Sequence, residues 1–558
     1  MNRKLFLITL LTMLCPVLSH AQVTAASCSE SDVSKAWATL KSSTTTFTIP
    51  SGTCAWTTTL ALTVPPGNTN LTIQGQTTVA GACYPTACTA TDSTIIVDNC
   101  SGCGGPFWQI TTGAASTLLR FTGLTIKGGS GGPEYNGMLD VDGFSQNVRV
   151  DHNHFDSASY NPANSSAELY VSGWIYGVAD HNVFDSSTDA IAGANNGIGV
   201  RMGSYGNDSL GIGDTSWASP TNFGSGNFFF IENNTINYGY ADDCSEGGRY
   251  VFRYNVLTGV EESQTHPTGG AGRFRGCRAT EVYKNLFYSG TTQCNGPSNS
   301  CQSFMRLTGG SSLIWGNAEE TSGSYQAGLL FEEMRNGLSY AQTATPDGWG
   351  YCGTNYNGTG SNWDKKTSTA TGYPCLDQGA YGQGDMLIGG FTADGTGSNN
   401  VENQTTSCLS TSACAYPRQA HEPVYEWLDQ LANTPVSAYS GAPSSVPYFT
   451  KNLDYFESSN PGSGANCNGF TGATGVGCGL LSARPSTCTA GPAATSPYQS
   501  YVPGVGYWAT DTSTLYVCSA TNAWTAYYTP YVYPHPLTQG QVSANPPAAP
   551  TNLKVVVN

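Results

Sequence analysis

The chain has 558 residues, only 11% of them charged, and its formal net charge is −16. Because phosphate neutralisation needs a basic surface, this balance argues against nucleic acid as a partner. Ordinary soluble domains carry about 25% charged residues, so a chain this poor in charge and rich in Gly, Ser, Thr and Asn is typical of an all-β protein.

Residues 1–21 read as a secretory signal. Arg3 and Lys4 precede an apolar run from Leu5 to Leu18, and Ser19-His20-Ala21 follows as a small-x-small cleavage pattern. A lipoprotein signal using Cys15 is the alternative, although Met13-Leu14 are bulky before it. No later apolar run approaches the ~18 residues needed to span a bilayer, so we expect a secreted, extracellular protein without a membrane span.

Disulfides are the expected use of the cysteines. Removing Cys15 from the 19 cysteines leaves 18, an even number in an oxidising compartment. Local staples are expected where two lie close together: Cys83 and Cys88, Cys100 and Cys103, Cys294 and Cys301, Cys408 and Cys414. The alternative for Cys100-Ser-Gly-Cys103 is half of a zinc site, but no second Cys-x-x-Cys completes it.

A repeated template, apolar-x-x-Asn-x-apolar, organises the first half of the chain. An early turn, "NLTIQG" (Asn70–Gly75), and "FTGLTI" (Phe121–Ile126), with Leu124 at the asparagine position, come first. The full copies hold Asn153, Asn182, Asn234, Asn255, Asn285 and Asn317, which are 29, 52, 21, 30 and 32 residues apart.

A period of this size, in units that alternate like strands, predicts a β-solenoid. The apolar template positions should form inward ladders on parallel strands ~4.8 Å apart. Asparagine suits a stacked turn, since it tolerates left-handed backbone and its amide can bond to the next coil.

From about Ala25 to Glu320 the chain resembles the right-handed parallel β-helix proteins of the pectin and pectate lyase superfamily, so we assign residues 22–325 to such a helix. "VRVDH" (Val148–His152) is similar to the pectate lyases' Val-Trp-Ile-Asp-His element, with Arg149 in place of tryptophan. Their Arg-x-Pro-x-x-Arg stretch, which carries the catalytic arginine, has no counterpart here, so carry-over of site residues by resemblance stops at Asp151 and His152.

The near-duplicates "VRVDHNHFD" and "GVADHNVFD" place Asp151 with Asp180 and His152 with His181 in register. The template continues the aspartate position with Glu232, Arg253, Tyr283 and Trp315. One interpretation is a polar ladder with satisfied histidines. The other is a calcium-binding ladder of Asp151, Asp180 and Glu232.

Charge is concentrated between Tyr240 and Asn285, and elimination on a uronic-acid polymer would need such charges: a cation, a base and an acid. We predict His266, Arg275 and Arg278 as catalytic, Arg253, Arg273 and Glu281 as substrate-binding, and Asp242, Asp243 and Glu262 as ligands of a possible Ca²⁺. A network of ion pairs locking coil to coil is the alternative. A disulfide between Cys244 and Cys277 should join neighbouring coils beside this site.

The template fades after about Ser324, and residues 326–540 are predicted to be a Cys-, Gly- and Pro-rich cap, with a sugar-binding module as the alternative. Within it, His421–Asn433 looks helical and Gly504–Pro536 looks like a small hairpin unit. Residues 541–558 resemble a linker.

These observations predict a secreted, monomeric protein acting on an extracellular polysaccharide, most simply a lyase that cleaves a uronic-acid polymer by β-elimination. A polygalacturonase-like hydrolase is the second interpretation: "STD" (Ser187–Asp189) and "ADDC" (Ala241–Cys244) echo its carboxylates, but its Gly-His-Gly is missing. The third is a non-catalytic structural or adhesive β-helix protein.

Overall fold

The structure is a computed structural model, and it describes part of the chain. The described residues are 21–103, 105–113, 118–131, 137–158, 160, 166–186, 197–205, 213–260, 263–265, 276–288, 303–320, 325, 327–331, 379–384, 419–431, 434–435, 438–440, 450–458, 469–494 and 496–539.

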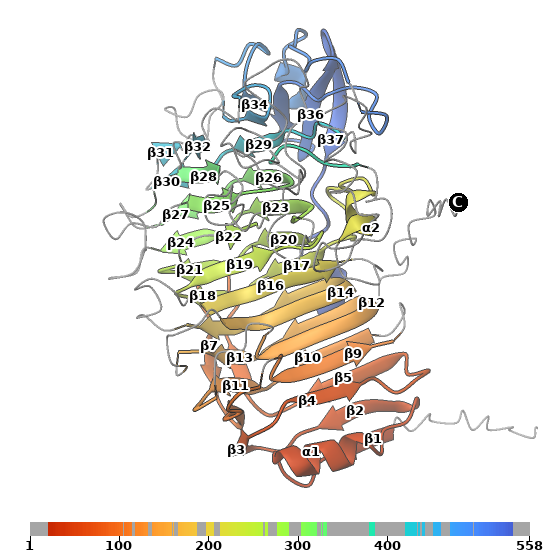
Figure 1. The fold of residues 1–558 in the computed structure, drawn as a ribbon. Coiled ribbons are helices and arrows are strands. Elements are labelled where there is room, and N and C mark those ends of the chain that lie inside the picture. The colour runs from red at the N-terminus through yellow and green to blue at the C-terminus, as the bar shows by residue number, and fades with distance from the viewer. Residues whose placement is uncertain are drawn as a thin grey trace, which may run out of the picture.

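The described strands wind into a parallel β-helix, a tall column with three sheets on its wall (Figure 1). Sheet A contains β1 (Ala21–Thr24), β2 (Thr44–Thr48), β5 (Asn70–Gln74), β10 (Leu118–Thr122), β17 (Phe229–Glu232), β20 (Arg249–Arg253), β23 (Ala279–Tyr283), β26 (Ser311–Trp315), β29 (Val424–Trp427) and β33 (Tyr455–Phe456). The predicted all-β, parallel β-helix class is therefore confirmed.

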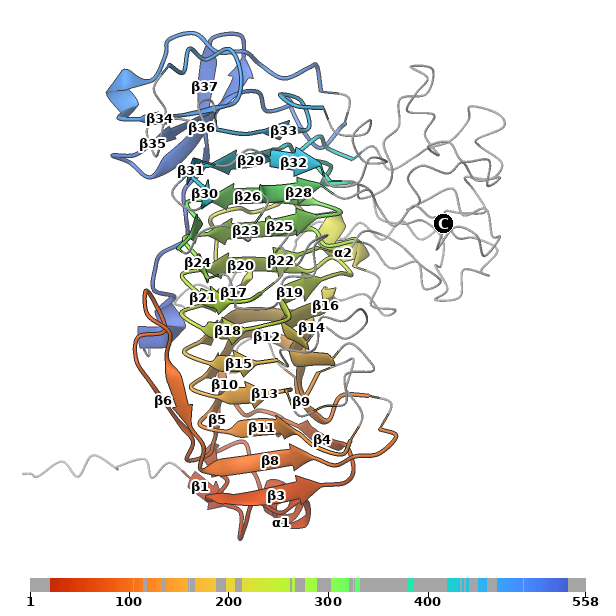
Figure 2. The ribbon, with the colours of Figure 1, turned by 90° about the vertical axis from the view of Figure 1, so that its left-hand side faces the viewer.

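Sheet B follows sheet A in each coil, as the view in Figure 2 shows. It contains β3 (Gly52–Trp56), β8 (Thr94–Asp98), β11 (Thr125–Gly128), β13 (His154–Asp156), β15 (Val183–Asp185), β18 (Thr235–Asn237), β21 (Val256–Thr258), β24 (Leu286–Tyr288), β27 (Ala318–Glu319) and β30 (Gln430–Leu431), with β31 (Thr434–Pro435) antiparallel at its end.

Sheet C precedes sheet A in each coil. It contains β4 (Leu60–Thr63), β9 (Trp108–Thr112), β16 (Gly197–Tyr205), β19 (Tyr240–Cys244), β22 (Ser263–Gln264), β25 (Ser303–Leu307), β28 (Ala327–Phe331) and β32 (Ala438–Ser440). Two long strands, β12 (Leu139–Asp151) and β14 (Ser166–Asp180), bend from sheet C into sheet A and belong to both. The base of the column is covered by α1 (Glu30–Trp37), which begins at the N-cap Ser29 and buries Val33 and Trp37.

Apolar template positions form the interior. Phe121, Val150 and Ala179 are aligned on successive strands of sheet A and are fully buried. On sheet B, Phe155 and Phe184 stack with ring centroids 5.0 Å apart. These ladders bury a continuous apolar core, as the sequence pattern predicts.

The asparagines stand in one row, at the turn between sheets A and B. The backbone N–H and the side-chain amide of Asn153 both donate to Oδ1 of Asn182, at 3.0 and 3.1 Å, and Asn182 bonds to Asn234 in the same way. The pattern continues through Asn255, Asn285 and Asn317 and ends at the carboxylate of Asp429. Every asparagine of the row is fully buried, so these bonds satisfy polar groups that water cannot reach.

One detail of this turn differs from the prediction. The left-handed backbone lies at the residue before each asparagine, with φ of 54° at both His152 and His181 and 53° at Asn233. The asparagine contributes its amide to the ladder, and the preceding residue makes the sharp change of direction.

Two features of chain organisation also differ. The 52-residue step between Asn182 and Asn234 is a single coil, because β14 pairs directly with β17, and the excursion includes the short helix α2 (Asp214–Trp217). Parallel pairing also continues beyond residue 325, through β28, β29, β32 and β33, so the column outlasts the recognisable template. The predicted helix at His421–Asn433 is wrong: Val424–Trp427 is a buried strand of sheet A, and three of its four residues pair with β26 of the preceding coil.

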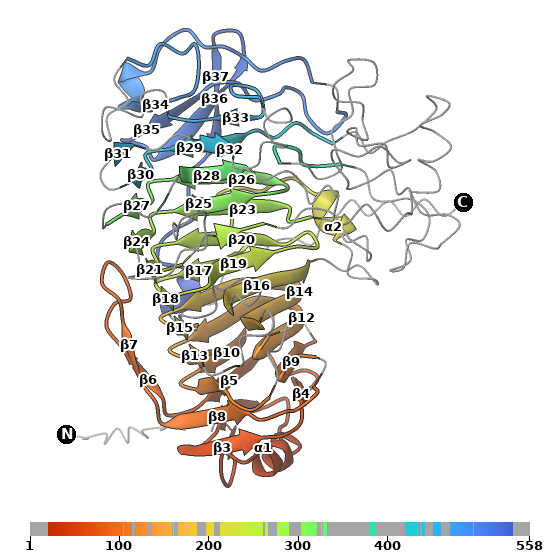
Figure 3. The ribbon, with the colours of Figure 1, turned by 60° about the vertical axis from the view of Figure 1, so that its left-hand side comes forward.

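Residues after 470 cover the outer face of sheet A near the top of the column (Figure 3). Strands β34 (Val476–Gly479), β35 (Gly506–Ala509), β36 (Thr514–Ala520) and β37 (Ala523–Tyr528) form a small sheet, which contains the predicted hairpin unit. Trp508 packs on Trp315 and Trp427, with ring centroids 5.0 and 5.3 Å away. Residues 529–539, here called the C-terminal strap, then run back down sheet A to Arg149.

The cysteine predictions fare well where they fall on described residues. Cys83–Cys88, Cys100–Cys103 and Cys244–Cys277 are disulfides, as predicted, which removes the zinc interpretation of Cys100 and Cys103. Cys28–Cys54 and Cys488–Cys518 are two more. The predicted pairs Cys294–Cys301 and Cys408–Cys414 lie outside the described residues.

Within the described residues, no helix is both long enough and apolar enough to cross a membrane. The predicted signal segment lies outside the described residues, apart from Ala21 at the start of β1.

Candidate functional site

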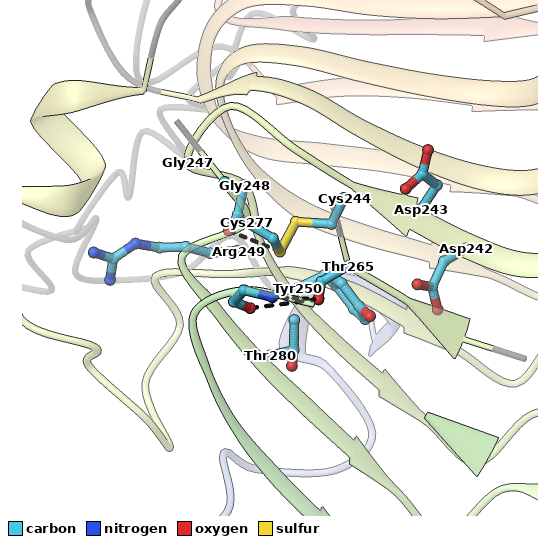
Figure 4. The surroundings of a disulfide bond; sticks show 12 residues. Asp242, Asp243, Cys244, Gly247, Gly248, Arg249, Tyr250, Thr265, Cys277 and Thr280 are labelled. Carbon is cyan, nitrogen blue, oxygen red and sulfur yellow. Dashed lines mark hydrogen bonds between the residues drawn. A yellow bond between two sulfur atoms is a disulfide. The ribbon is translucent and has the colours of Figure 1, made fainter. Parts of the chain in front are cut away.

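The consecutive carboxylates Asp242 and Asp243 point to opposite faces of β19, because side chains alternate along a strand (Figure 4). Asp242 aligns with the core residue Val200 and accepts a 2.6 Å bond from the hydroxyl of Ser263. Burial raises the pKa of Asp242 to about 7. Asp243 faces outward, with Oδ2 3.7 Å from Nε of Arg201. The two cannot hold the same cation, and they do not supply a hydrolase's carboxylate pair on one surface.

Arg278, predicted as catalytic, is fully buried in a structural role. Its guanidinium donates to both carboxylate oxygens of Glu422 and to the backbone oxygen of Ser219, and it lies 5.2 Å from the ring centre of Trp217. Nearby, Arg249 donates to the backbone oxygens of residues 216, 219, 220 and 221. These arginines hold the segment that follows α2 against the column. Figure 4 shows Arg249 extending away from Asp242 and Asp243, with the Cys244–Cys277 disulfide between them.

Arg253 and Glu281, predicted to bind substrate, are buried beneath the C-terminal residues. Arg253 donates to Glu232 at 2.6 Å, to the hydroxyl of Tyr283, and to the backbone oxygens of Tyr531 and Val532 in the strap. Glu281 accepts bonds from the backbone of Gly224 and the hydroxyl of Tyr528, and burial raises its pKa to about 7. Neither side chain can touch a polymer while these contacts hold.

Four predicted site residues, His266, Arg273, Arg275 and Glu262, lie outside the described residues, as does the Ser187–Asp189 stretch. Among the residues that the structure does describe, no group of three His, Cys, Asp or Glu side chains could hold a metal ion. The described part of the chain therefore does not supply the predicted calcium ligand set.

The aspartate ladder on sheet A consists of ion pairs. Asp151, Asp180, Glu232, Arg253, Tyr283 and Trp315 occupy successive strands in the predicted register. Arg120 binds Asp151 through two bonds of 2.7 and 2.6 Å, and Arg149 binds Asp180 through two of 2.8 Å. Burial opposes ionisation of Asp151, but its bonds to Arg120 and His152 and the charge of Arg149 outweigh it and lower its pKa to about 2.

The interpretation as a polar ladder therefore fits the structure, and each histidine of the turn contacts its neighbouring aspartate through Nδ1. The carboxylates that a calcium ladder would require are occupied by guanidinium groups.

A second charged ladder lies on the outer face of sheet C, and we take it as the candidate functional site. Its members, on successive coils, are Gln109, Asp140, Tyr170, Arg201 and Asp243. Gln264 continues the row on the next coil, and Arg306 on the coil after that. The neighbours Leu139, Leu169 and Val200 point inward and form the core. The same alternation that builds the interior therefore places this polar row outside.

The members of the sheet C ladder differ in charge, in their contacts and in exposure to solvent. Asp140 accepts bonds from Gln109 at 3.0 Å and from Ser172 at 3.0 Å, and burial together with the charge of Asp142 raises its pKa to about 7. Arg201 lies 5.5 Å from the ring centre of Tyr170. Tyr170 and Arg306 are partly exposed, whereas Asp140, Arg201 and Asp243 are buried. A cation, a phenol and a carboxyl that holds its proton near pH 7 thus lie along one line.

Sequence reasoning singled out Asp243 but missed Asp140, Tyr170 and Arg201. The signal was a second repeat ahead of the asparagine template, with alternating polar and apolar residues in "LDVDG", "ELYVS" and "VRMGS". Charge clustering drew attention to residues 240–285 instead, where Asp243, Arg253 and Arg278 form ion pairs inside the fold.

Comparison with known proteins adds little to this picture. No protein-family model matches the chain, and no curated protein matches it. Among solved structures, the crystal structure of an alginate lyase from Paenibacillus sp. str. FPU-7 matches with 13% sequence identity and a TM-score of 0.31, over 55% of this chain and 98% of that chain. At that TM-score the likeness does not establish a shared function.

Proposed function

We propose that the protein is a secreted polysaccharide lyase that cleaves a uronic-acid polymer by β-elimination on the outer face of sheet C. The observation that carries this proposal is the ladder through Asp140, Tyr170, Arg201 and Asp243, which runs parallel to the column axis. A linear polymer lying along the column would contact the partly exposed Tyr170 and Arg306, and Asp140, Arg201 and Asp243 are buried beside them.

The chemistry assigns a role to each type of group. Elimination requires neutralisation of the uronate carboxylate, so that the proton on the adjacent carbon becomes acidic, and then transfer of that proton to a base. Arg201 supplies the cation, and Tyr170, beside it, is the base once its phenol has lost its proton to solvent, so that the proton taken from carbon restores the phenol. The raised pKa of Asp140, about 7, leaves a proton for donation to the leaving oxygen near neutral pH.

Two sequence predictions remain part of the proposal. His266 follows the last described residue of its coil, Thr265, which itself comes directly after Gln264 of the ladder. It stays a candidate base, with Arg275 as a candidate cation. Calcium assistance also stays a proposal, and Asp242 is removed from its ligand set because it points into the core.

The direct test is incubation of the full chain with alginate and with polygalacturonate, followed by ultraviolet absorbance of the unsaturated product, with calcium and with a chelator. We expect product from at least one polymer. Tyr170→Phe and Arg201→Ala should each lower turnover about 100-fold or more, because one removes a proton-transfer group and the other removes charge stabilisation. Arg120→Ala, a partly exposed arginine on sheet A, is the matched control and should keep full activity.

Other outcomes separate the alternatives. New reducing ends without absorbance would indicate hydrolysis, and no product on a broad polyuronate panel would favour a structural or adhesive protein. Full activity in Tyr170→Phe and in Arg201→Ala would move the site away from the sheet C ladder, with His266→Ala as the next variant to measure.

A further inference from the structure

The turn between sheets A and B carries two histidines in register, away from the sheet C ladder. His152 and His181 stack with ring centroids 5.1 Å apart and planes within 2° of each other. Their side chains are 37% and 26% exposed. The left-handed backbone at both residues directs the two side chains the same way.

Each imidazole is held by a buried carboxylate. Nδ1 of His152 lies 2.7 Å from Asp151, and Nδ1 of His181 lies 2.8 Å from Asp180. Both carboxylates are ion-paired with arginine, as described above, and a carboxylate only accepts hydrogen bonds, so Nδ1 carries the hydrogen. This leaves the lone pair of Nε2 available on each ring. A carboxylate behind the histidine is the arrangement that fixes the tautomer and the ring orientation of metal-binding imidazoles.

Two excursions flank this turn without burying it. The hairpin of β6 (Thr78–Ala80) and β7 (Thr89–Thr91) packs on Val183 of sheet B through the Cys83–Cys88 disulfide. The C-terminal strap reaches Arg149 on sheet A through the backbone oxygen of Leu537, and Figure 2 shows hairpin and strap along the same side of the column.

His154, only two residues from His152, behaves differently. Its two nitrogens lie 2.8 Å from Asp92 and 3.0 Å from Asp185, and its side chain is 13% exposed. It has no nitrogen left for a ligand.

We propose that His152 and His181 form a binding site for a divalent transition metal of the Cu²⁺, Ni²⁺ and Zn²⁺ class, with water completing the coordination. A metal–nitrogen distance of about 2 Å requires the two Nε2 atoms to come within about 4 Å. The stacked rings must therefore tilt together at their outer edges, which their partial exposure permits. No third His, Cys, Asp or Glu joins them among the described residues, so the site has two protein ligands there.

The test is titration of the full chain with Cu²⁺, the metal of this class with the highest general affinity, followed by calorimetry and electron paramagnetic resonance. The variants are His152→Asn and His181→Asn. Asparagine can donate to the carboxylate, and Asn233 already occupies the equivalent position one coil higher with the same backbone conformation. Circular dichroism should confirm that both variants fold. His154→Gln is the matched control.

We expect each asparagine variant to weaken the tightest Cu²⁺ site at least 10-fold and to remove one imidazole from its nitrogen hyperfine pattern, with no change in His154→Gln. Copper bound elsewhere on the chain would persist in every variant, so the result is the difference in Cu²⁺ binding between the wild type and each variant. Unchanged copper binding in the double variant His152→Asn/His181→Asn, or a wild-type spectrum showing a single imidazole, would overturn the proposal. None of these results depends on lyase activity.

Discussion

Sheets A and C present two outward ladders on the same coils, built from the same kinds of residue, yet the two ladders differ in what their charges contact. On sheet A, Asp151, Asp180 and Glu232 are each paired with arginine, and the upper part of the face is covered by residues 504–539. On sheet C, Asp140, Arg201 and Asp243 are also buried, and the partly exposed members of the described row include Tyr170 and Arg306.

In a β-helix, the partners of an outward-facing charge depend on which segment of the chain covers it. Desolvated charges must find partners within the protein, and Arg253 finds Glu232, a phenol and two backbone oxygens. On sheet C, Arg201 lies 3.7 Å from Asp243 and 5.5 Å from the ring centre of Tyr170, so its charge also has partners within the protein.

Arg253→Ala should produce the largest loss of stability. It leaves Glu232 buried without its cation and removes two bonds to the strap, at a cost of about 3–5 kcal/mol in the free energy of unfolding. Urea denaturation followed by tryptophan fluorescence measures this. A loss below about 1 kcal/mol would mean that the cover over sheet A is not tightly held.

The disulfide between Cys244 and Cys277 joins the end of β19 in sheet C to the coil that leads into sheet A. Its sequence separation is 33, against 5 for Cys83–Cys88. Cys244→Ala/Cys277→Ala should therefore cost about 3–4 kcal/mol, and Cys83→Ala/Cys88→Ala about 2 kcal/mol, because a longer loop loses more entropy when closed. Equal denaturation midpoints for the two double variants would contradict this order.

Acid should weaken the sheet A ladder in a defined range of pH. The pKa of Asp151 is lowered from 3.8 to about 2 in the folded chain. A carboxyl whose pKa is lower in the folded state stabilises the fold at any pH above its pKa in the unfolded chain. This stabilisation, about 2 kcal/mol, is lost as the pH falls from about 4 to 2. Denaturation curves at several pH values should show the loss in the wild type and a smaller one in Asp151→Asn. Parallel profiles would show that the ion pair contributes no pH dependence.

Arg120→Ala should have the smallest effect, about 1 kcal/mol, because this side chain is 38% exposed and Asp151 keeps its contacts with Arg149 and His152. The same denaturation assay compares it with Arg253→Ala. If Arg120→Ala lowered the free energy of unfolding as much as Arg253→Ala, the exposure of an arginine would not predict how much its ion pair stabilises the fold.

Much of the fold followed from local pattern. The asparagine spacing and the apolar positions around it identified the coils, and the register from Asp151 to Trp315 was predictable because each coil repeats one strand and one turn. The strand at Val424–Trp427 was not predicted because its sequence no longer matches the template, with Asp429 in the asparagine position.

The sequence by itself determined the column and which residues stack on its wall, since both depend on periods of two residues and of one coil. Only the tertiary structure decided which charges face solvent. Arg253 lies on a strand of sheet A, and the backbone of Tyr531, 278 residues away, covers it. Burial of an outer face is set by contacts between distant segments, which no local period encodes.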